Sequence, residues 1–212
     1  MKKKFIIIIV ISCIVIISIF AIYMLHNRGI FFSSEGRYDD SELDYMGVIF
    51  ENSTDINAFN EGFSTSSGCP WGFEHNGIDF FFNNNSNVIA AAPGQVWEIS
   101  NYIGEGKNKY HVKLNIRFSN SIIIGYGFEP WTDNTSDRDK QRDMLQVKVG
   151  DWVQKGDVIA QFLQCNESAH IHFDVIENNQ RYCPTQYFST DGYAQMMALI
   201  HFYHPTWDLC YP

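Results

Sequence analysis

The chain has 212 residues and a formal net charge of −9 at pH 7, from 15 Lys and Arg against 24 Asp and Glu. Lys2, Lys3 and Lys4 precede every other charged residue, which leaves 12 basic against 24 acidic residues in the remainder. This acidic balance argues against a nucleic-acid partner, because binding to nucleic acid depends on neutralising phosphates.

The first predicted element is an apolar segment over residues 5–25 that contains no charged side chain. As a helix it is long enough to cross a hydrocarbon core of roughly 30 Å. It is longer than the apolar core of a signal peptide and has no Ala-x-Ala-like end, so we predict an uncleaved transmembrane signal anchor. The three preceding lysines place residues 1–4 in the cytoplasm and the rest of the chain outside it. Residues 26–45 are polar and form a predicted stalk.

From Met46 onward the chain reads as strands and turns, most clearly where polar and apolar residues alternate over 110–118. Other strands are predicted over 88–92, 95–99, 171–176, from 122 onward, and twice within 151–162. Residues 130–143 are too polar for a core and are predicted to be a surface loop. Helical periodicity is found only over 193–203. We therefore predict one all-β domain, a β-sandwich with a short C-terminal helix, over residues 46–212.

Four cysteines follow the predicted anchor: Cys69, Cys165, Cys183 and Cys210. An even number in an oxidising compartment suggests disulfides, but four cysteines allow three pairings that sequence cannot separate. We favour Cys183 with Cys210, which would pin the C-terminal segment, and Cys69 with Cys165. The alternative is that one or more remain free.

Two short segments hold the densest set of metal-ligand residues in the chain, His75–Asp79 and His170–His172. In a strand, residues i and i+2 share a face, so His170 and His172 would project together while Ile171 faces the core. Two histidines and an aspartate can hold zinc and leave one position for water. We interpret His111, His201 and His204 as surface or core histidines that do not bind the metal. His111 lies in the middle of a predicted strand, where it either lines the site or faces solvent.

At these segments the chain resembles the lysostaphin-type (LytM-like) zinc metallopeptidases, which cut peptide cross-links in bacterial cell walls. The family's H-x-x-x-D motif matches His75 to Asp79, and its final H-x-H motif matches His170 to His172. The resemblance covers residues 70–178. It implies a mostly antiparallel β fold with a groove, Zn²⁺ held by His75, Asp79 and His172, and a catalytic role for His170.

One departure from the family concerns a further catalytic histidine, normally found in a Tyr-x-His-Leu-like motif. If Tyr126 matches the tyrosine of that motif, the histidine is replaced by Phe128; a shift of one residue makes it Gly127. Losing such a group commonly costs about 10²–10⁴ in rate. Glu129 or Tyr126, which adjoin the altered position, are the predicted replacements.

These observations leave two functions open. The first is a membrane-anchored, extracytoplasmic zinc endopeptidase that acts on peptides or a cell-wall polymer. The second is a catalytically weakened zinc-binding relative that binds the wall or partner proteins. A cupin-like metal barrel is rejected because Gln164 stands where that motif needs glycine. A lipoyl- or biotin-carrier domain is rejected because it has no use for His75 or His170.

Overall fold

The computed structural model describes residues 11–22 and 45–212. Residues 11–22 are helical. Within the described ranges, no helix has the length and apolar character needed to cross a membrane. The anchor predicted over 5–25 therefore gains no support, and its two ends lie outside the described residues. The predicted cytoplasmic residues 1–4 and the stalk, apart from Tyr45, lie outside them too.

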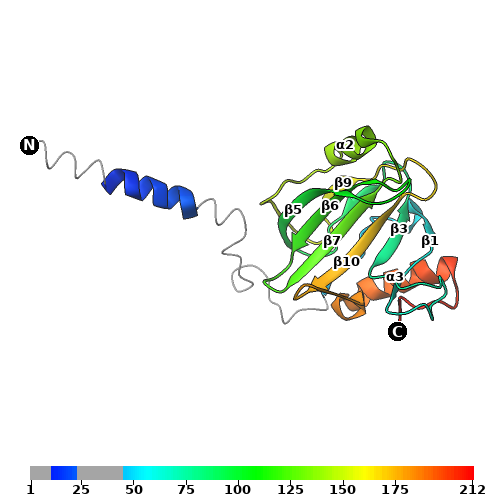
Figure 1. Ribbon diagram of the computed structural model, residues 1–212. Helices are drawn as coiled ribbons and strands as arrows, with labels where there is room; N and C mark the ends of the chain where they lie inside the picture. The colour runs from blue at the N-terminus through cyan, green and yellow to red at the C-terminus, as the bar shows by residue number, and fades with distance from the viewer. Residues whose placement is uncertain (1–10, 23–44) are drawn as a thin grey trace, which may run out of the picture. The chain divides into compact units, whose positions relative to one another are not determined.

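The domain is built on one large sheet whose paired strands all run antiparallel (Figure 1). Its strands follow the order β1 (Ile56–Phe59), β3 (Ile78–Phe82), β10 (His170–Glu177), β7 (Ile122–Glu129), β6 (Tyr110–Arg117), β5 (Gly94–Ile103) and β8 (Trp152–Val153), with β11 (Gln180–Tyr182) paired to β10. Two small sheets pair β4 (Asn87–Ile89) with β9 (Val158–Gln161), and β2 (Phe63–Ser64) with β12 (Cys210–Tyr211). The mostly antiparallel β fold is confirmed. The predicted sandwich is replaced by one large sheet, because only short strands form the other layers.

Alternation along the strands separates a buried face of the large sheet from an open one. On β10, Ile171, Phe173 and Val175 are at most 1% exposed and join the hydrophobic core. Val88 of β4 and Ile159 of β9 belong to the same core. Residues between the buried positions point to the open face. This period of two is what brings polar side chains from neighbouring strands together on one surface.

Helix α3 (Thr190–Tyr203) confirms the predicted C-terminal helix and begins earlier, where the Ser189 side chain accepts a hydrogen bond from Gly192 N–H. The predicted surface loop over 130–143 is wrong in its second half, which forms α2 (Thr135–Asp143). Asn134 caps α2 by accepting a hydrogen bond from Ser136 N–H. Helical periodicity missed α2 because its one buried side chain is the polar Gln141. Two short 3-10 helices, η3 (Ser53–Asp55) and η4 (Pro184–Tyr187), complete the described elements.

One disulfide, Cys183–Cys210, is formed as predicted. It holds β12, which pairs in parallel with β2. The predicted partner bond is wrong, because Cys69 and Cys165 are both free. Cys69 donates from its sulfur to the carbonyl of Phe73 within its own turn, whereas the exposed Cys165 hydrogen-bonds through its backbone to Pro130.

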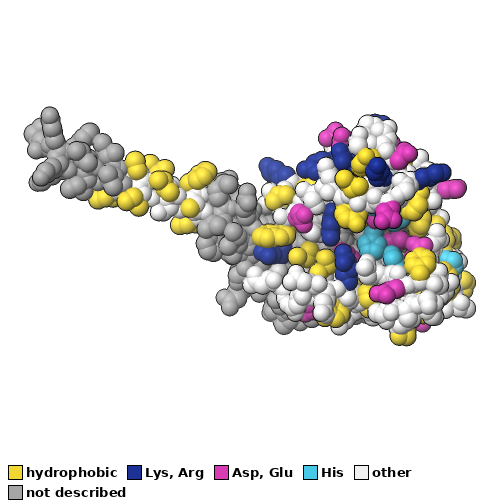
Figure 2. All heavy atoms as spheres, in the orientation of Figure 1, with side chains coloured by type: hydrophobic (Ala, Val, Ile, Leu, Met, Phe, Trp, Pro, Cys, Tyr) yellow, Lys and Arg dark blue, Asp and Glu magenta, His cyan; other side chains and the backbone are white. Residues whose placement is uncertain are grey.

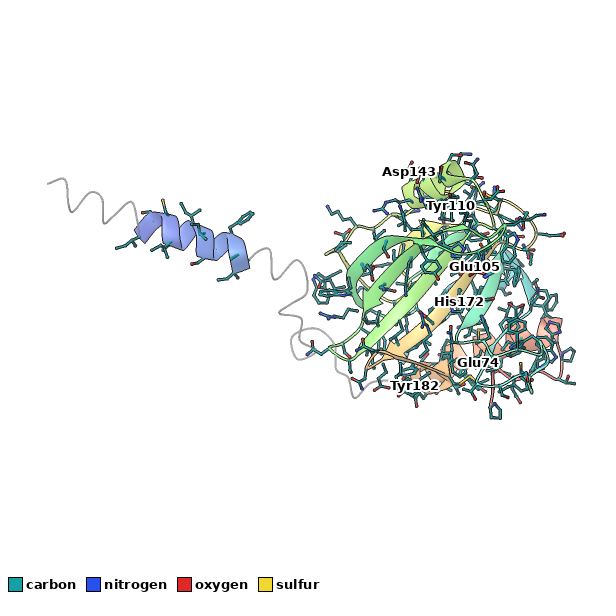
Figure 3. All side chains as sticks on the ribbon, viewed as in Figure 1. Glu74, Glu105, Tyr110, Asp143, His172 and Tyr182 are labelled. Atoms are coloured by element: carbon teal, nitrogen blue, oxygen red, sulfur yellow. A yellow bond between two sulfur atoms is a disulfide. The ribbon has the colours of Figure 1, made fainter. Side chains whose placement is uncertain are left out.

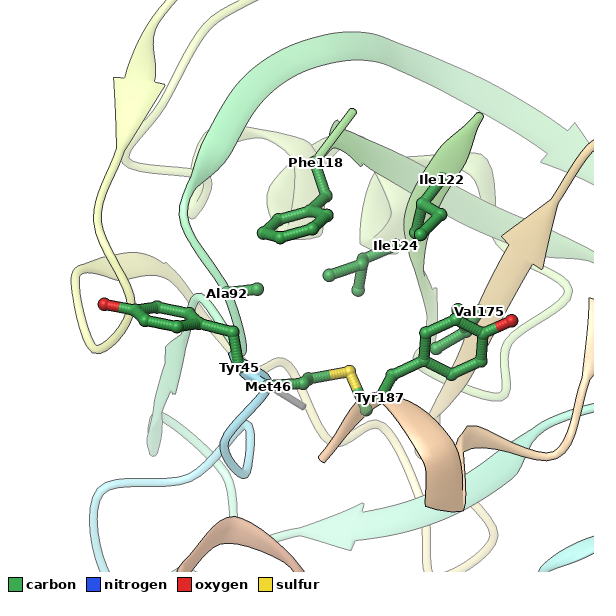
Figure 4. A pocket seen from close by; sticks show the side chains of 8 residues that line it. All are labelled: Tyr45, Met46, Ala92, Phe118, Ile122, Ile124, Val175 and Tyr187. Atoms are coloured by element: carbon green, nitrogen blue, oxygen red, sulfur yellow. The ribbon is translucent and has the colours of Figure 1, made fainter. Parts of the chain in front are cut away.

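A small apolar cavity lies between the large sheet and the segment around Met46 (Figure 4). Phe118, Ile124, Val175 and Tyr187 are among its lining residues. Its volume is about 10 Å³, which is close to the room that a single water needs. It is a packing gap, and too small to be a ligand site.

Candidate metal centre

His75, Asp79 and His172 come together on the open face of the large sheet. His75 lies in the turn before β3, and Asp79 of β3 is paired directly with His172 of β10. The distances are 2.9 Å from His172 Nδ1 to Asp79 Oδ1, 3.2 Å from His172 Nδ1 to His75 Nε2, and 3.3 Å from His75 Nε2 to Asp79 Oδ1. Donors bound tetrahedrally to zinc at 2.0–2.1 Å stand about 3.3 Å apart. The three atoms therefore have the spacing that one such cation requires.

Two neighbours fix the orientation of these imidazoles. His75 Nδ1 lies 2.7 Å from the carbonyl oxygen of Gly62. A carbonyl only accepts, so the proton is on Nδ1 and the lone pair of Nε2 points into the triangle. Gly77 leaves room for the other ring, since a Cβ there would lie 2.5 Å from two ring atoms of His172. The glycine between His75 and Asp79 is thus required by the close approach of His172.

His170 lies beside the triangle and is not part of it. Its Nδ1 donates to the carbonyl of Ser168 at 2.9 Å. Its Nε2 is 3.5 Å from Asp79 Oδ2 and 3.4 Å from Glu129 Oε2. The imidazole therefore stands between a carboxylate of the triangle and a second carboxylate. That position suits the exchange of a proton with a reacting group.

The strand register decides which residue of β7 faces His170. His170 is paired with Glu129, whereas Phe128 is paired with the core residue Ile171 and is fully buried. Gly127, paired with His172, faces the site but has no side chain. Neither Phe128 nor Gly127, the two positions that match the family's histidine, therefore offers a functional group to the site, whereas Glu129 does.

Tyr126, the other predicted replacement, lies in the core. It is fully buried, and its hydroxyl accepts a hydrogen bond from Ala91 N–H at 2.7 Å. Burial raises the pKa of Tyr126, which keeps the phenol neutral. The structure thus places Tyr126 away from the open face and removes it as a candidate.

Glu129 has two further partners, of which the sequence analysis named His111 but not Asn108. Asn108 Nδ2 donates to Glu129 Oε2 at 2.5 Å, and His111 Nδ1 is 3.7 Å from Glu129 Oε1. His111 Nε2 donates to the carbonyl of Asn108 at 2.9 Å. His111, Glu129 and His172 line the same cavity of about 180 Å³. His111 therefore lines the site and does not face bulk solvent. The alternation of polar and apolar residues along its strand was the sequence signal for this placement.

Glu61 is a second residue that the sequence did not single out. It lies between β1 and β2, and its carbonyl accepts from Asp79 N–H at 3.0 Å. Burial, together with the hydrogen bond and negative charge of Asp79, raises the pKa of Glu61 to about 8. Glu61 carries no motif and comes from a loop, so only the folded chain places it beside Asp79.

The carboxylates control the charge of the imidazoles. Burial alone would lower the pKa of His170, but the charges of Asp79 and Glu129 and the hydrogen bond to Glu129 raise it to about 10. Burial alone would raise the pKa of Asp79, yet cationic His170 and the hydrogen bonds of His172 and His75 hold it well below its usual range. A bound dication would compete with His170 for the charge of Asp79. The site therefore holds an ionised carboxylate ready to meet a cation.

All five residues predicted for the site lie together, and their roles stay predictions. Figure 3 shows His172 on the face of the large sheet turned to the viewer, and Figure 2 shows histidine atoms exposed on that face with acidic and basic side chains around them. His201, on α3, is exposed to solvent, and His204 is held by the carbonyl of Phe59. Both positions agree with the prediction that these two histidines do not bind the metal.

Residues 73–184 match the family model described as peptidase family M23. No curated protein matches the chain. A zinc-containing peptidase from Vibrio cholerae is 20% identical over 66% of this chain and 39% of its own, with a TM-score of 0.47. This chain thus spans well under half the length of that peptidase.

Two further solved structures cover more of their own chains. The catalytic domain of lysostaphin from Staphylococcus simulans is 20% identical over 63% of this chain and 92% of its own, with a TM-score of 0.39. A chain of the SpoIIQ–SpoIIIAH pore-forming complex is 13% identical over 73% of this chain and 97% of its own, with a TM-score of 0.48. The family match covers more than half of the 212 residues and includes every ligand-type residue of the triangle. The chain belongs to peptidase family M23, the lysostaphin-type (LytM-like) peptidases.

Proposed function

We propose that the protein is a zinc metalloendopeptidase that cuts peptides of a bacterial cell wall. The observation that carries this proposal is the triangle of His75 Nε2, Asp79 Oδ1 and His172 Nδ1, with sides of 2.9–3.3 Å. The test is hydrolysis of cross-linked wall peptides by the zinc-loaded full chain, with and without a chelator. Hydrolysis that a chelator leaves untouched would contradict the proposal.

The donor set fits zinc in type as well as spacing. Two neutral imidazoles and a carboxylate form a common set for catalytic zinc, which keeps a further position open for water. When bound in such a site, zinc lowers the pKa of water to about 7 and polarises a carbonyl. The Gly62 carbonyl accepts the hydrogen bond from His75 Nδ1. Metal-binding histidines commonly donate such a bond from the ring nitrogen that does not bind the metal.

The proton chemistry falls to His170 and Glu129. His170 Nε2 is free of the backbone, unlike its Nδ1, and it faces Glu129 and Asp79. Glu129 favours the protonated imidazole, which can donate to an oxyanion or to a leaving amine. Asn108 holds the other side of Glu129, so the carboxylate is oriented before a substrate arrives.

Replacing Glu129 with Gln is expected to slow hydrolysis about 10–100-fold, the usual cost of losing an orienting partner near a metal site. Zinc content should stay the same, because Glu129 is not one of the three clustered ligands. Losing the negative charge lowers the pKa of His170, so the limb of the pH–rate profile that reports His170 should move to lower pH. Glu105→Gln, at an exposed position, is the matched control. An unchanged rate and profile would exclude Glu129 from the reaction.

A second function, a catalytically weakened zinc-binding protein that binds the wall or partner proteins, is favoured by one observation. The β7 position facing His170 is Glu129, so the family's further histidine is not on that strand. His111 of β6 restores an imidazole to the same cavity from the neighbouring strand. We therefore place the enzyme first. Stoichiometric zinc together with wall binding and no hydrolysis would reverse that order.

We also propose that the chain is anchored in a membrane by residues 5–25, with residues 46–212 outside the cytoplasm. This rests on the uncharged segment and on Lys2, Lys3 and Lys4 before it, and the disulfide Cys183–Cys210 agrees with an oxidising compartment. The full chain should stay with membranes through an alkaline carbonate wash, and protease added to intact cells should digest its C-terminal domain. Release by the wash would contradict the anchor, and full protection would contradict the orientation.

A further inference from the structure

A trough with a free cation lies beside the candidate metal centre on the open face of the large sheet. Lys113, Gly127, His172, Asp174 and Arg181 line it, within the cavity of about 180 Å³ described above. Gly127 of β7 is paired with Lys113 on one side and with His172 on the other. Directly paired residues point to the same face, so Lys113 and His172 flank the glycine.

The glycine keeps the floor of the trough open. Gly127 has no side chain, and the nearest atoms to a Cβ placed there would be those of His172, at 3.4 Å, and Glu129, at 3.6 Å. Adjacent strands lie about 4.8 Å apart, so the backbones of Lys113 and His172 are roughly 10 Å from each other. A peptide residue lying over Gly127 would therefore have the candidate metal ligand on one side and the Lys113 ammonium on the other.

The acids around the trough already have partners, whereas Lys113 does not. Asp174 is 3% exposed and accepts from Arg181 Nε at 2.5 Å. Glu129 is engaged by Asn108 and His170. Within residues 45–212, no carboxylate pairs with the Lys113 ammonium and no group accepts a hydrogen bond from it. Across the strand pair from Lys113 stands Ser100, which is neutral.

The free ammonium is out of keeping with the net charge of −9 that the chain carries. Lys113 is only partly exposed and stands in a hollow whose second cation, Arg181, is already paired with Asp174. A carboxylate placed there would form charge-assisted hydrogen bonds, which are about twice as strong as neutral ones. A neutral substrate group would leave the ammonium without such a partner.

We propose that Lys113 is the centre of a carboxylate-binding subsite, so that the preferred substrate is a peptide with a carboxylate next to the bond that is cut. The subsite rests on the proposed peptidase function, and it names the class of substrate for that site. The carboxylate is either an acidic side chain or a free C-terminus. Lys113 binds and positions the substrate, and it takes no part in proton transfer.

The test measures binding separately from cutting. The full chain with His170→Ala, which should bind peptides and cut them far more slowly than the native chain, is titrated with peptides that carry an acidic side chain or its amide, and a free or an amidated C-terminus. The carboxylate form that fits should bind about tenfold or more tightly than its amide. Adding Lys113→Met should bring that ratio close to one and leave the affinity for amide peptides unchanged. Lys113→Arg should keep the preference.

Lys148→Met removes the same charge at an exposed position outside the trough and is the matched control. Melting temperatures of all variants show whether a loss comes from misfolding. An equal preference in the Lys113→Met and Lys148→Met chains, or no preference in the parent, overturns the subsite. If the preference depends on Lys113 but the native chain cuts no peptide, the subsite stands and the peptidase function fails. If the chain cuts acidic and amide peptides equally well, the reverse holds.

Discussion

Replacing His172 with alanine is expected to remove zinc from the protein and to abolish peptide hydrolysis with it. His172 Nδ1 is the corner of the triangle with the two shortest sides, 2.9 Å to Asp79 and 3.2 Å to His75. Losing a residue that only hydrogen-bonds to a metal ligand already weakens metal binding about 10–100-fold. Losing a ligand itself should therefore weaken zinc binding more than about 100-fold. The measurement is zinc per chain after dialysis against a chelator of moderate affinity.

Thermal unfolding gives a second reading of the same change. A metal that binds only the folded state stabilises it, so zinc should raise the melting temperature of the native chain and not that of the variant. His201→Ala removes an exposed imidazole from α3 and should behave as the native chain does. A His172→Ala chain that keeps its zinc through dialysis would show that the ion is held elsewhere.

Replacing His170 with alanine is expected to leave zinc in place and to lower kcat/KM for peptide hydrolysis about 10²–10⁴-fold, the usual contribution of a positioned acid or base. The difference from His172 follows from geometry. His170 Nδ1 is bound to the Ser168 carbonyl, and its Nε2 faces two carboxylates at 3.4 and 3.5 Å rather than the centre of the triangle. The two histidines of one H-x-H motif should therefore give opposite results for zinc.

The control for this experiment is again His201→Ala, measured in both assays. Equal loss of zinc from the His170 and His172 variants would make His170 a fourth ligand and remove it as the proton carrier. An unchanged rate with full zinc would show that other groups, such as His111, carry the proton. Either result would also change how Glu129 is interpreted, because its contact with His170 is the reason for assigning it a role.

Much of the fold could be predicted because the strands alternate cleanly. Ile171, Phe173 and Val175 define one face of β10, so His170 and His172 had to share the other. The same rule would have placed His111 on the site face of its strand. The strand order could not be predicted, since β3 and β10, far apart in the chain, are neighbours in the sheet. Only that pairing sets Asp79 opposite His172.

The features that the sequence did not reveal lack such a pattern. Helix α2 buries one polar residue, so the apolar periodicity that marks most helices is missing. Glu61 approaches Asp79 from a loop without a motif. By sequence, the family's missing histidine corresponds to Phe128 or Gly127, and Glu129 was one of two predicted substitutes beside that position. The β7–β10 register, which sequence does not contain, gives Glu129.

The central claim, that this chain is a zinc peptidase, is tested most directly by measuring zinc per chain and cleavage of cross-linked wall peptides on the same full-length preparation. We expect about one zinc per chain, with cleavage that stops when the metal is removed and returns when zinc is restored. About one zinc per chain with no cleavage of any wall peptide would contradict the claim and leave a zinc-containing binding protein.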